Sequence, residues 1–236
     1  MSIMHRFVGM PIWSKSVFIL MIVLFVQCQT NYQIYPYISP NIPIKPSYEN
    51  NKKIDQIIKP YAKQLDSVIN QVVGFCPTFI EKQKPSSALG NMMSDAVLYI
   101  SKKAGYSVDF CILNYGGIRS TLDSGLITLG EIYELMPFEN QITILKIPSD
   151  IAQELQNHVI NKGGEPMSEG FQNLQNPDKP YYHVAINDYM ANGGDGYQFL
   201  AKAIQRWDTN IKIRDGLIDY IMNHNPLPLN FNERKL

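Results

Sequence analysis

Residues 110–120 read FCILNYGGIRS, an apolar run that ends at an asparagine followed by two glycines and an arginine. The run from Val108 to Leu113 predicts a buried β-strand, and glycines such as Gly117 let a backbone approach a ligand closely. A turn has no need of an arginine, whose planar guanidinium donates paired hydrogen bonds to a carboxylate or phosphate. Asn114 and Arg119 are therefore candidate ligand contacts, although one such loop taken alone is more typical of a plain turn.

Helical and strand-like segments alternate on both sides of this loop, and no internal repeat is visible. Such interleaving predicts an α/β (α+β) layered domain in which a mixed sheet is flanked by helices. Apolar periodicity predicts helices over 54–72, 88–104, 130–136, 149–161 and 213–223, and strands over 108–113, 126–129, 142–147 and 181–186.

The N-terminus carries an export-type segment. Arg6 and Lys15 precede an apolar run, Val17–Val26, which is shorter than the ~20 residues that span a bilayer. A secretory signal is the first interpretation, and a short membrane anchor is the alternative. Cys28 follows the run as in a bacterial lipoprotein processing site, although Gln27 replaces the usual small residue. We expect an exported protein of the periplasm or cell envelope, anchored in the membrane if Cys28 is lipidated.

The predicted organisation has three parts: the signal over 1–28, a tether over 29–50, and a single domain over 51–236. The tether holds four prolines among Asn, Tyr and Ser, a composition that favours an extended spacer. Lys+Arg and Asp+Glu are equal at 21 each, so charge gives no reason to expect nucleic acid as a partner. Cys76 and Cys111 lie in apolar surroundings and are expected to be buried and free, with a disulfide between them as the alternative.

Two further loops present unusual side chains. Phe138 and Asn140 follow a proline. Tyr189 precedes the glycines of YMANGGDGY, and Asp195 lies between two of them. Two rings can hold a flat heterocycle, and an ionised carboxylate suits a ribose diol. The plainer alternatives are core rings and a glycine turn. Calcium binding is set aside, because glycine–aspartate calcium loops occur in repeat arrays and this chain has one copy.

In order along the chain, these motifs resemble a known family. Gly90-Asn91 with Asp95-Ala96, then NxGGIR, PF-N and YMANGGDGY, resemble the C-terminal domain of the 5′-nucleotidase and UDP-sugar hydrolase family, from about residue 51 to 225. The resemblance implies a fold of that type and a nucleotide or nucleoside ligand.

The resemblance also implies residue roles. Phe138 and Tyr189 would stack on the base, where the family usually has Phe at the second position. Asp195 would accept from the ribose hydroxyls. The ribose–phosphate end would meet Asn114 and Arg119, and the base edge would meet Asn140.

Two departures from the family pattern stand out. Gln83, in Lys82-Gln83-Lys84, lies where the family often has an arginine that contacts phosphate, so phosphate contact would weaken or pass to a lysine. The segment 161–180 is shorter than usual, and we expect a peripheral hairpin to be missing there.

In the family, hydrolysis belongs to a separate metallophosphoesterase domain with two metal ions. None of the four histidines, His5, His158, His183 and His224, lies in a motif of such a site. We therefore expect no catalytic residue, metal or cofactor in this chain, and divalent metals only in a partner phosphoesterase. The leading hypothesis is a free-standing nucleotide-binding half of a 5′-nucleotidase that works with this partner in trans. An exported nucleotide- or nucleoside-binding protein without hydrolytic role is the alternative, and intrinsic hydrolysis by an unrecognised site is a third.

Overall fold

A computed structural model describes residues 13, 43, 45, 51–174 and 179–234, and its compact unit comprises Asn51–Leu236. The predicted signal, Cys28 and nearly all of the tether lie outside the described residues. Among the residues that the structure describes, no helix has the length and apolar character needed to cross a membrane.

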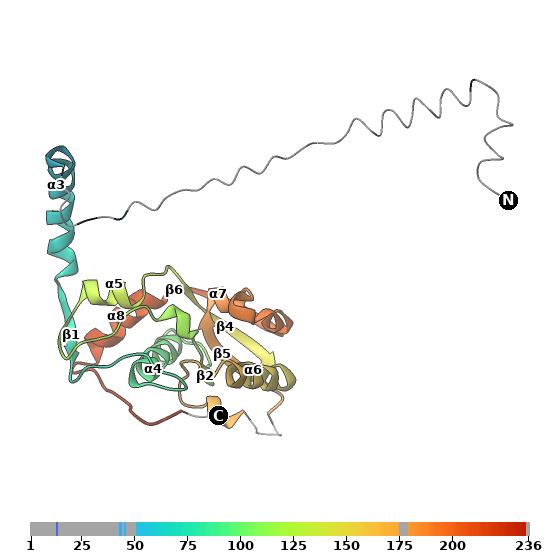
Figure 1. Ribbon diagram of the computed structural model, residues 1–236. Helices are drawn as coiled ribbons and strands as arrows, with labels where there is room; N and C mark the ends of the chain where they lie inside the picture. The colour runs from blue at the N-terminus through green and yellow to red at the C-terminus, as the bar shows by residue number, and fades with distance from the viewer. Residues whose placement is uncertain (1–12, 14–42, 44, 46–50, 175–178, 235–236) are drawn as a thin grey trace. The chain divides into compact units, whose positions relative to one another are not determined.

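The centre of the unit is a four-stranded mixed sheet in the order β2-β5-β4-β6 (Figure 1). β2 runs parallel to β5, whereas β4 is antiparallel to both β5 and β6. A second, two-stranded antiparallel sheet pairs β1 with β3. The mixed sheet with flanking helices confirms the predicted fold class. The strands are β1 (Val72–Cys76), β2 (Phe110–Cys111), β3 (Gly125–Thr128), β4 (Gln141–Pro148), β5 (Tyr181–Asn187) and β6 (Gln205–Lys212).

The sheet separates two hydrophobic cores, because successive strand residues point to opposite faces. In β4, Ile142 and Ile144 join one core, and Leu145 and Ile147 join the other. The first core includes residues of α4, α5 and α8, and the second includes residues of α6 and α7. The helices are α3 (Lys52–Ile69), α4 (Ala88–Lys103), α5 (Leu129–Leu135), α6 (Ser149–Asn161), α7 (Asp188–Ala191) and α8 (Ile213–Asn223).

Sequence periodicity located most helices and missed part of the sheet. The helices predicted over 149–161 and 213–223 have those bounds, and Ser87 caps α4 as a helix N-cap should. The strand predicted over 108–113 was too long, because only Phe110–Cys111 joins the ladder. Val72 was wrongly placed in the first helix and begins β1. β6 was missed because this edge strand is largely exposed and polar.

Cys76 and Cys111 are both free and buried, so the free-thiol interpretation is confirmed and the disulfide alternative is wrong. Burial raises the pKa of both thiols, that of Cys111 well above the usual range.

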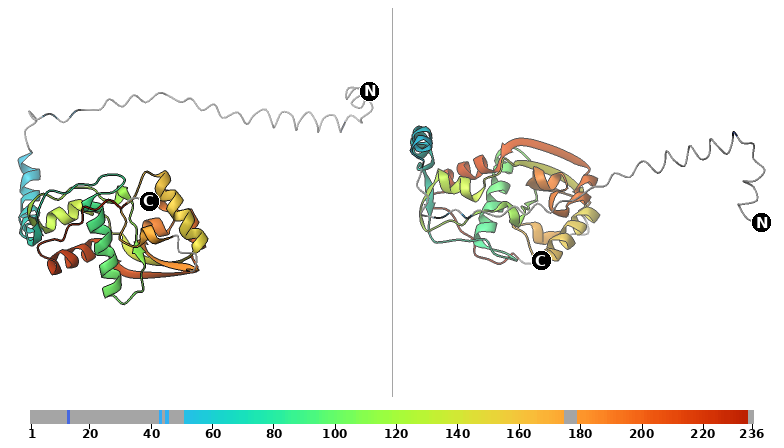
Figure 2. Two further views of the ribbon diagram at one scale, coloured as in Figure 1. Left: turned by 90° about the horizontal axis from the view of Figure 1, so that it is seen from below. Right: turned by 45° about the horizontal axis from the view of Figure 1, so that its top comes forward.

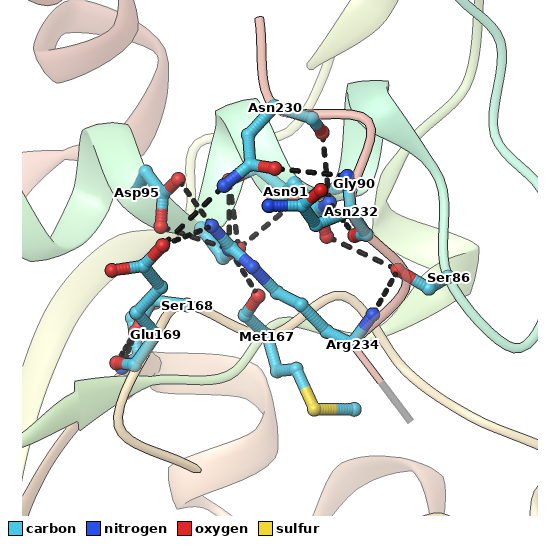
Figure 3. A network of polar contacts seen from close by, with 12 residues as sticks. Ser86, Gly90, Asn91, Asp95, Met167, Ser168, Glu169, Asn230, Asn232 and Arg234 are labelled. Carbon is cyan, nitrogen blue, oxygen red and sulfur yellow. Dashed lines mark hydrogen bonds and ion pairs between the residues drawn. The ribbon is translucent and has the colours of Figure 1, made fainter. Parts of the chain in front are cut away.

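A C-terminal strap, residues 224–234, returns from α8 and is fastened by one buried arginine (Figure 3). Arg234 is only 3% exposed, and its guanidinium donates to both carboxylate oxygens of Asp95 at 2.9 and 2.7 Å. It also donates to the carbonyl of Met167 at 2.7 Å. One side chain thus joins the strap, α4 and the segment after α6.

The GN motif of α4 serves the same strap. The Asn91 amide donates to the carbonyls of Asn230 and Asn232, at 2.9 and 3.0 Å. Asn91 and Asp95 therefore hold the C-terminal strap in place.

Replacing Arg234 with alanine is expected to lower the free energy of unfolding by about 2–4 kcal/mol, because Asp95 and the Met167 carbonyl lose their donor. Asp95 keeps some contact with water, which limits the loss. Urea denaturation measures the change. Arg206→Ala, which removes an exposed pair with Asp208, is the control and should lose about 1 kcal/mol or less. Equal losses in the two variants would contradict the role of the strap.

Candidate functional site

A cleft of about 650 Å³ opens where three loops meet. The first loop follows β2, the second follows α5, and the third comprises the short helix α7 and the residues after it. All seven residues that the sequence singled out for ligand binding line this cleft: Asn114, Gly117, Arg119, Phe138, Asn140, Tyr189 and Asp195.

The parallel pairing of β2 and β5 brings the first and third loops together, because the carboxyl ends of parallel strands meet at one edge of the sheet. Asn114 follows β2 and Asn187 ends β5. The Asn187 amide donates to Asn114 Oδ1 at 2.8 Å, while its own Oδ1 accepts from the backbone N–H of Met190 and caps α7. The two loops are therefore joined by a buried side-chain hydrogen bond.

The Asp195 carboxylate lines the cleft and is oriented by two hydrogen bonds. Its Oδ2 accepts from the Asn114 amide and its Oδ1 from the Tyr189 hydroxyl, each at 2.9 Å. Each carboxylate oxygen has a further lone pair for a ligand hydroxyl. The residue has φ 54°, a left-handed conformation that non-glycine residues rarely adopt. A Cβ at Gly194 would lie 2.4 Å from the Tyr189 ring, so a side chain there would have to displace this ring.

Phe138 and Tyr189 are partly exposed aromatic walls of the cleft, at 40% and 45%. The alternative that both rings belong to the core is therefore wrong. The hydrogen bond to Asp195 raises the pKa of the Tyr189 hydroxyl, which stays protonated as a donor. Compared with the phenylalanine that is usual in the family, Tyr189 adds a fixed contact to the carboxylate.

The Phe138 loop is anchored by Arg214, a residue that sequence reasoning did not assign to the site. Arg214 is 4% exposed, donates to the carbonyls of Met136 and Phe138, and pairs with Glu139. Lys212 also pairs with Glu139, at 2.5 Å. Hydrogen bonds from Lys212 and Arg214 lower the pKa of Glu139 to about 2. An arginine among the apolar positions of a predicted helix was the available signal.

Positive charge gathers at the Arg119 end of the cleft. The Lys82 ammonium donates to the carbonyl of Ile118 at 2.6 Å and lies 4.5 Å from the centre of the Tyr115 ring. Burial, and secondly the charge of Arg119, lower the pKa of Lys82. Gln83 is exposed. On either side of Gln83, Lys82 and Lys84 therefore both reach the Asn114–Arg119 loop, since the Lys84 ammonium lies 5.3 Å from the centre of the Tyr115 ring.

Glu165 is a second residue that the sequence did not reveal. It is buried and accepts from the backbone N–H of Tyr115, contacts the Tyr197 hydroxyl at 3.4 Å and pairs with Lys162 at 3.2 Å. Lys162 also donates to the carbonyl of Asp195. Glu165 therefore ties the first loop to the third, and nothing in the pattern of its GGEP segment marks it.

Asn140 and the question of a metal site complete the description of the cleft. The Asn140 amide donates to Asp188 Oδ1 at 2.7 Å, leaving its Oδ1 and one N–H for other partners. Within residues 51–174 and 179–234, no group of three His, Cys, Asp or Glu side chains is arranged to hold a metal ion.

Comparison with known proteins shows similarity to one family. Residues 69–168 match the family model described as 5′-nucleotidase, C-terminal domain. A trifunctional nucleotide phosphoesterase of Bacillus subtilis is 28% identical over 76% of this chain and 14% of its own length. A snake venom 5′-nucleotidase of Macrovipera lebetinus is 25% identical over 64% of this chain and 50% of its own length.

Solved structures agree on the fold. The 5′-nucleotidase precursor of Thermus thermophilus superposes with a TM-score of 0.62 at 23% identity, over 75% of this chain and 41% of that protein. The chain is therefore similar to the 5′-nucleotidase C-terminal domain family over residues 69–168. It spans a quarter or less of the length of the first three curated relatives that it matches.

The Glu139 carboxyl should titrate near pH 2, well below its ordinary 4.5. Because the folded-state pKa is depressed, the pairing with Lys212 and Arg214 is complete above about pH 4.5 and is lost as the pH falls through 2. Carboxyl ¹³C shifts across this range measure the midpoint. Lys212→Met should move it upward, whereas the remote Lys103→Met should not. A midpoint near 4.5 in the unaltered protein would contradict the anchoring of the Phe138 loop.

Proposed function

We propose that the cleft binds a nucleotide and that this chain is the nucleotide-binding half of a 5′-nucleotidase-type phosphohydrolase that acts in nucleotide catabolism. One observation carries the proposal: two exposed rings, a carboxylate held by two donors, and an arginine line a single cleft. This combination matches the chemistry of a base, a ribose diol and a phosphate, respectively.

The rings and charged groups of the cleft set the orientation that we propose for the nucleotide. The base stacks on Phe138 and Tyr189, and the ribose hydroxyls donate to Asp195. The phosphate lies toward Arg119, which lines the cleft, and toward Lys82, which reaches the same loop through the carbonyl of Ile118. Asn140 offers its free oxygen and N–H to the base edge.

Hydrolysis is assigned to a separate metallophosphoesterase chain that acts in trans and binds the divalent metals. Two-metal hydrolysis requires clustered oxygen and nitrogen ligands, and the described residues offer no such cluster. In this proposal the chain itself orients the nucleotide and excludes water from the base.

We also propose that the protein is exported to the periplasm or cell envelope and anchored through a lipid on Cys28. Support comes from the sequence of the first 28 residues and from a 28% identical relative named cell wall protein Lmo0130, of Listeria monocytogenes. A surface nucleotide- or nucleoside-binding protein without hydrolytic role is the alternative. It is favoured by the fact that this one chain supplies every side chain assigned to the ligand.

Binding of AMP and adenosine to the chain from Gln29 onward tests the site. Asp195→Ala should weaken both ligands by about 10- to 100-fold, the loss of hydrogen bonds to a charged group. Isothermal titration calorimetry measures the affinities. Asp123→Ala, which removes an exposed carboxylate from another loop, is the matched control and should bind normally. Equal affinity in the two variants, or no binding by the folded wild type, would overturn the assignment of the cleft.

Hydrolysis in trans is tested by mixing. Each metallophosphoesterase of the same genome that lacks this domain is assayed for phosphate release from AMP, with and without the present chain. One pair should show a rise of about tenfold or more, since a bound and oriented substrate reacts faster. The same mixture with Asp195→Ala should show none. AMP binding without a rise in any pair would favour the non-hydrolytic alternative.

A further inference from the structure

The helix α3 presents an apolar stripe that no other described residue of the compact unit covers. None of its 18 residues is buried. It lies at the edge of the unit in all three views (Figures 1 and 2). The stripe consists of six side chains that are 46–70% exposed: Ile54, Ile57, Ile58, Tyr61, Leu65 and Val68.

The helix is anchored at its C-terminal end. There Ile69 packs against Gly130, and the backbone N–H of Leu129 donates to the carbonyl of Gln71 at 2.8 Å. Pro60 lies inside the helix and removes one backbone hydrogen bond. Helices of this length draw most of their stability from packing of the apolar face. The stripe of α3 therefore needs a partner surface.

Five of the six side chains of the stripe are spaced symmetrically along the helix, and Ile58 has no counterpart because the mirrored position holds Gln64. Its central residues are Ile54, Ile57, Tyr61, Leu65 and Val68, with successive spacings of three, four, four and three residues. The spacings read the same in both directions from Tyr61. A two-fold interface requires such a self-complementary patch, because each copy presents the same residues in reverse order.

The charged residues of α3 leave the stripe free. At 3.6 residues per turn, they fall on the far side of the helix or at its margin. Two copies can therefore approach without like charges in the contact. These residues are Lys52, Lys53, Asp55, Lys59, Lys63 and Asp66.

We propose that α3 is the contact surface for a second copy of this chain, with the two helices antiparallel and the two-fold axis at Tyr61. Ile54 then faces Val68 of the partner subunit, and Ile57 faces Leu65 of the partner subunit. The Tyr61 rings meet each other at the axis. An 18-residue helix is about 27 Å long, so this contact is smaller than a standard interface. The dimer should be weak and depend on concentration.

A symmetric cross-link tests the axis. In the chain from Gln29 onward, which contains both hydrophobic cores, Cys76 and Cys111 are buried. Tyr61→Cys should therefore form an intersubunit disulfide under mild oxidation, seen as a dimer on non-reducing gels. Lys63→Cys places the thiol on the opposite side of the same helix and should remain monomeric. Equal cross-linking of the two variants would overturn the proposed axis.

Sedimentation equilibrium tests the association itself. The wild-type chain should shift from monomer to dimer as its concentration rises, and Ile57→Lys with Leu65→Lys should remain monomeric. AMP affinity and the circular dichroism of the domain should be unchanged, which separates lost contact from lost folding. A wild type that stays monomeric up to about millimolar concentration, the range of very weak complexes, overturns the proposal. Monomers that instead float with phosphatidylglycerol vesicles through α3 would assign the stripe to a membrane surface.

Discussion

The site depends on one chain of hydrogen bonds that begins at the parallel pairing of β2 and β5. That pairing places Asn187 beside Asn114, and the Asn114 amide donates a hydrogen bond to the Asp195 carboxylate. Tyr189 closes the chain by donating to the same carboxylate. The Asn187–Asn114 bond is buried and the Tyr189–Asp195 bond lies at the cleft. The pairing of the strands therefore fixes the position of the Asp195 carboxylate, which can contact a ligand. Buried polar networks specify one arrangement when every member is satisfied.

Buried charged groups hold the loops around this chain. Arg214 fixes the Phe138 loop, Glu165 joins the first loop to the third, and Arg234 fastens the C-terminal strap. A buried ion pair adds little net stability over an apolar pair, yet removing one partner is costly. Such groups suit irregular segments, where backbone polar atoms lack the partners that a helix or a sheet provides.

The cleft and α3 differ in whether one chain supplies all the contacts that we assign to them. The side chains assigned to the nucleotide come from one chain, whereas the apolar stripe of α3 has no cover within the described residues. The proposed nucleotide site and the proposed contact surface of α3 therefore lie in different parts of the unit. The first rests on a preorganised polar network, and the second rests on the area of exposed apolar side chains.

The sequence by itself predicted the fold class, several helices and seven residues that line the cleft. Periodicity and glycine loops are local properties of the chain, and the resemblance of the ordered motifs to a known family joined the three loops into one expected site. Only the tertiary structure decided that β6 is a strand, that Arg214 and Glu165 are buried beside the loops, and that the α3 stripe is uncovered. Burial depends on which distant segments pack together. The same amphipathic pattern describes α6, whose apolar face lies in the core, and α3, whose apolar face does not.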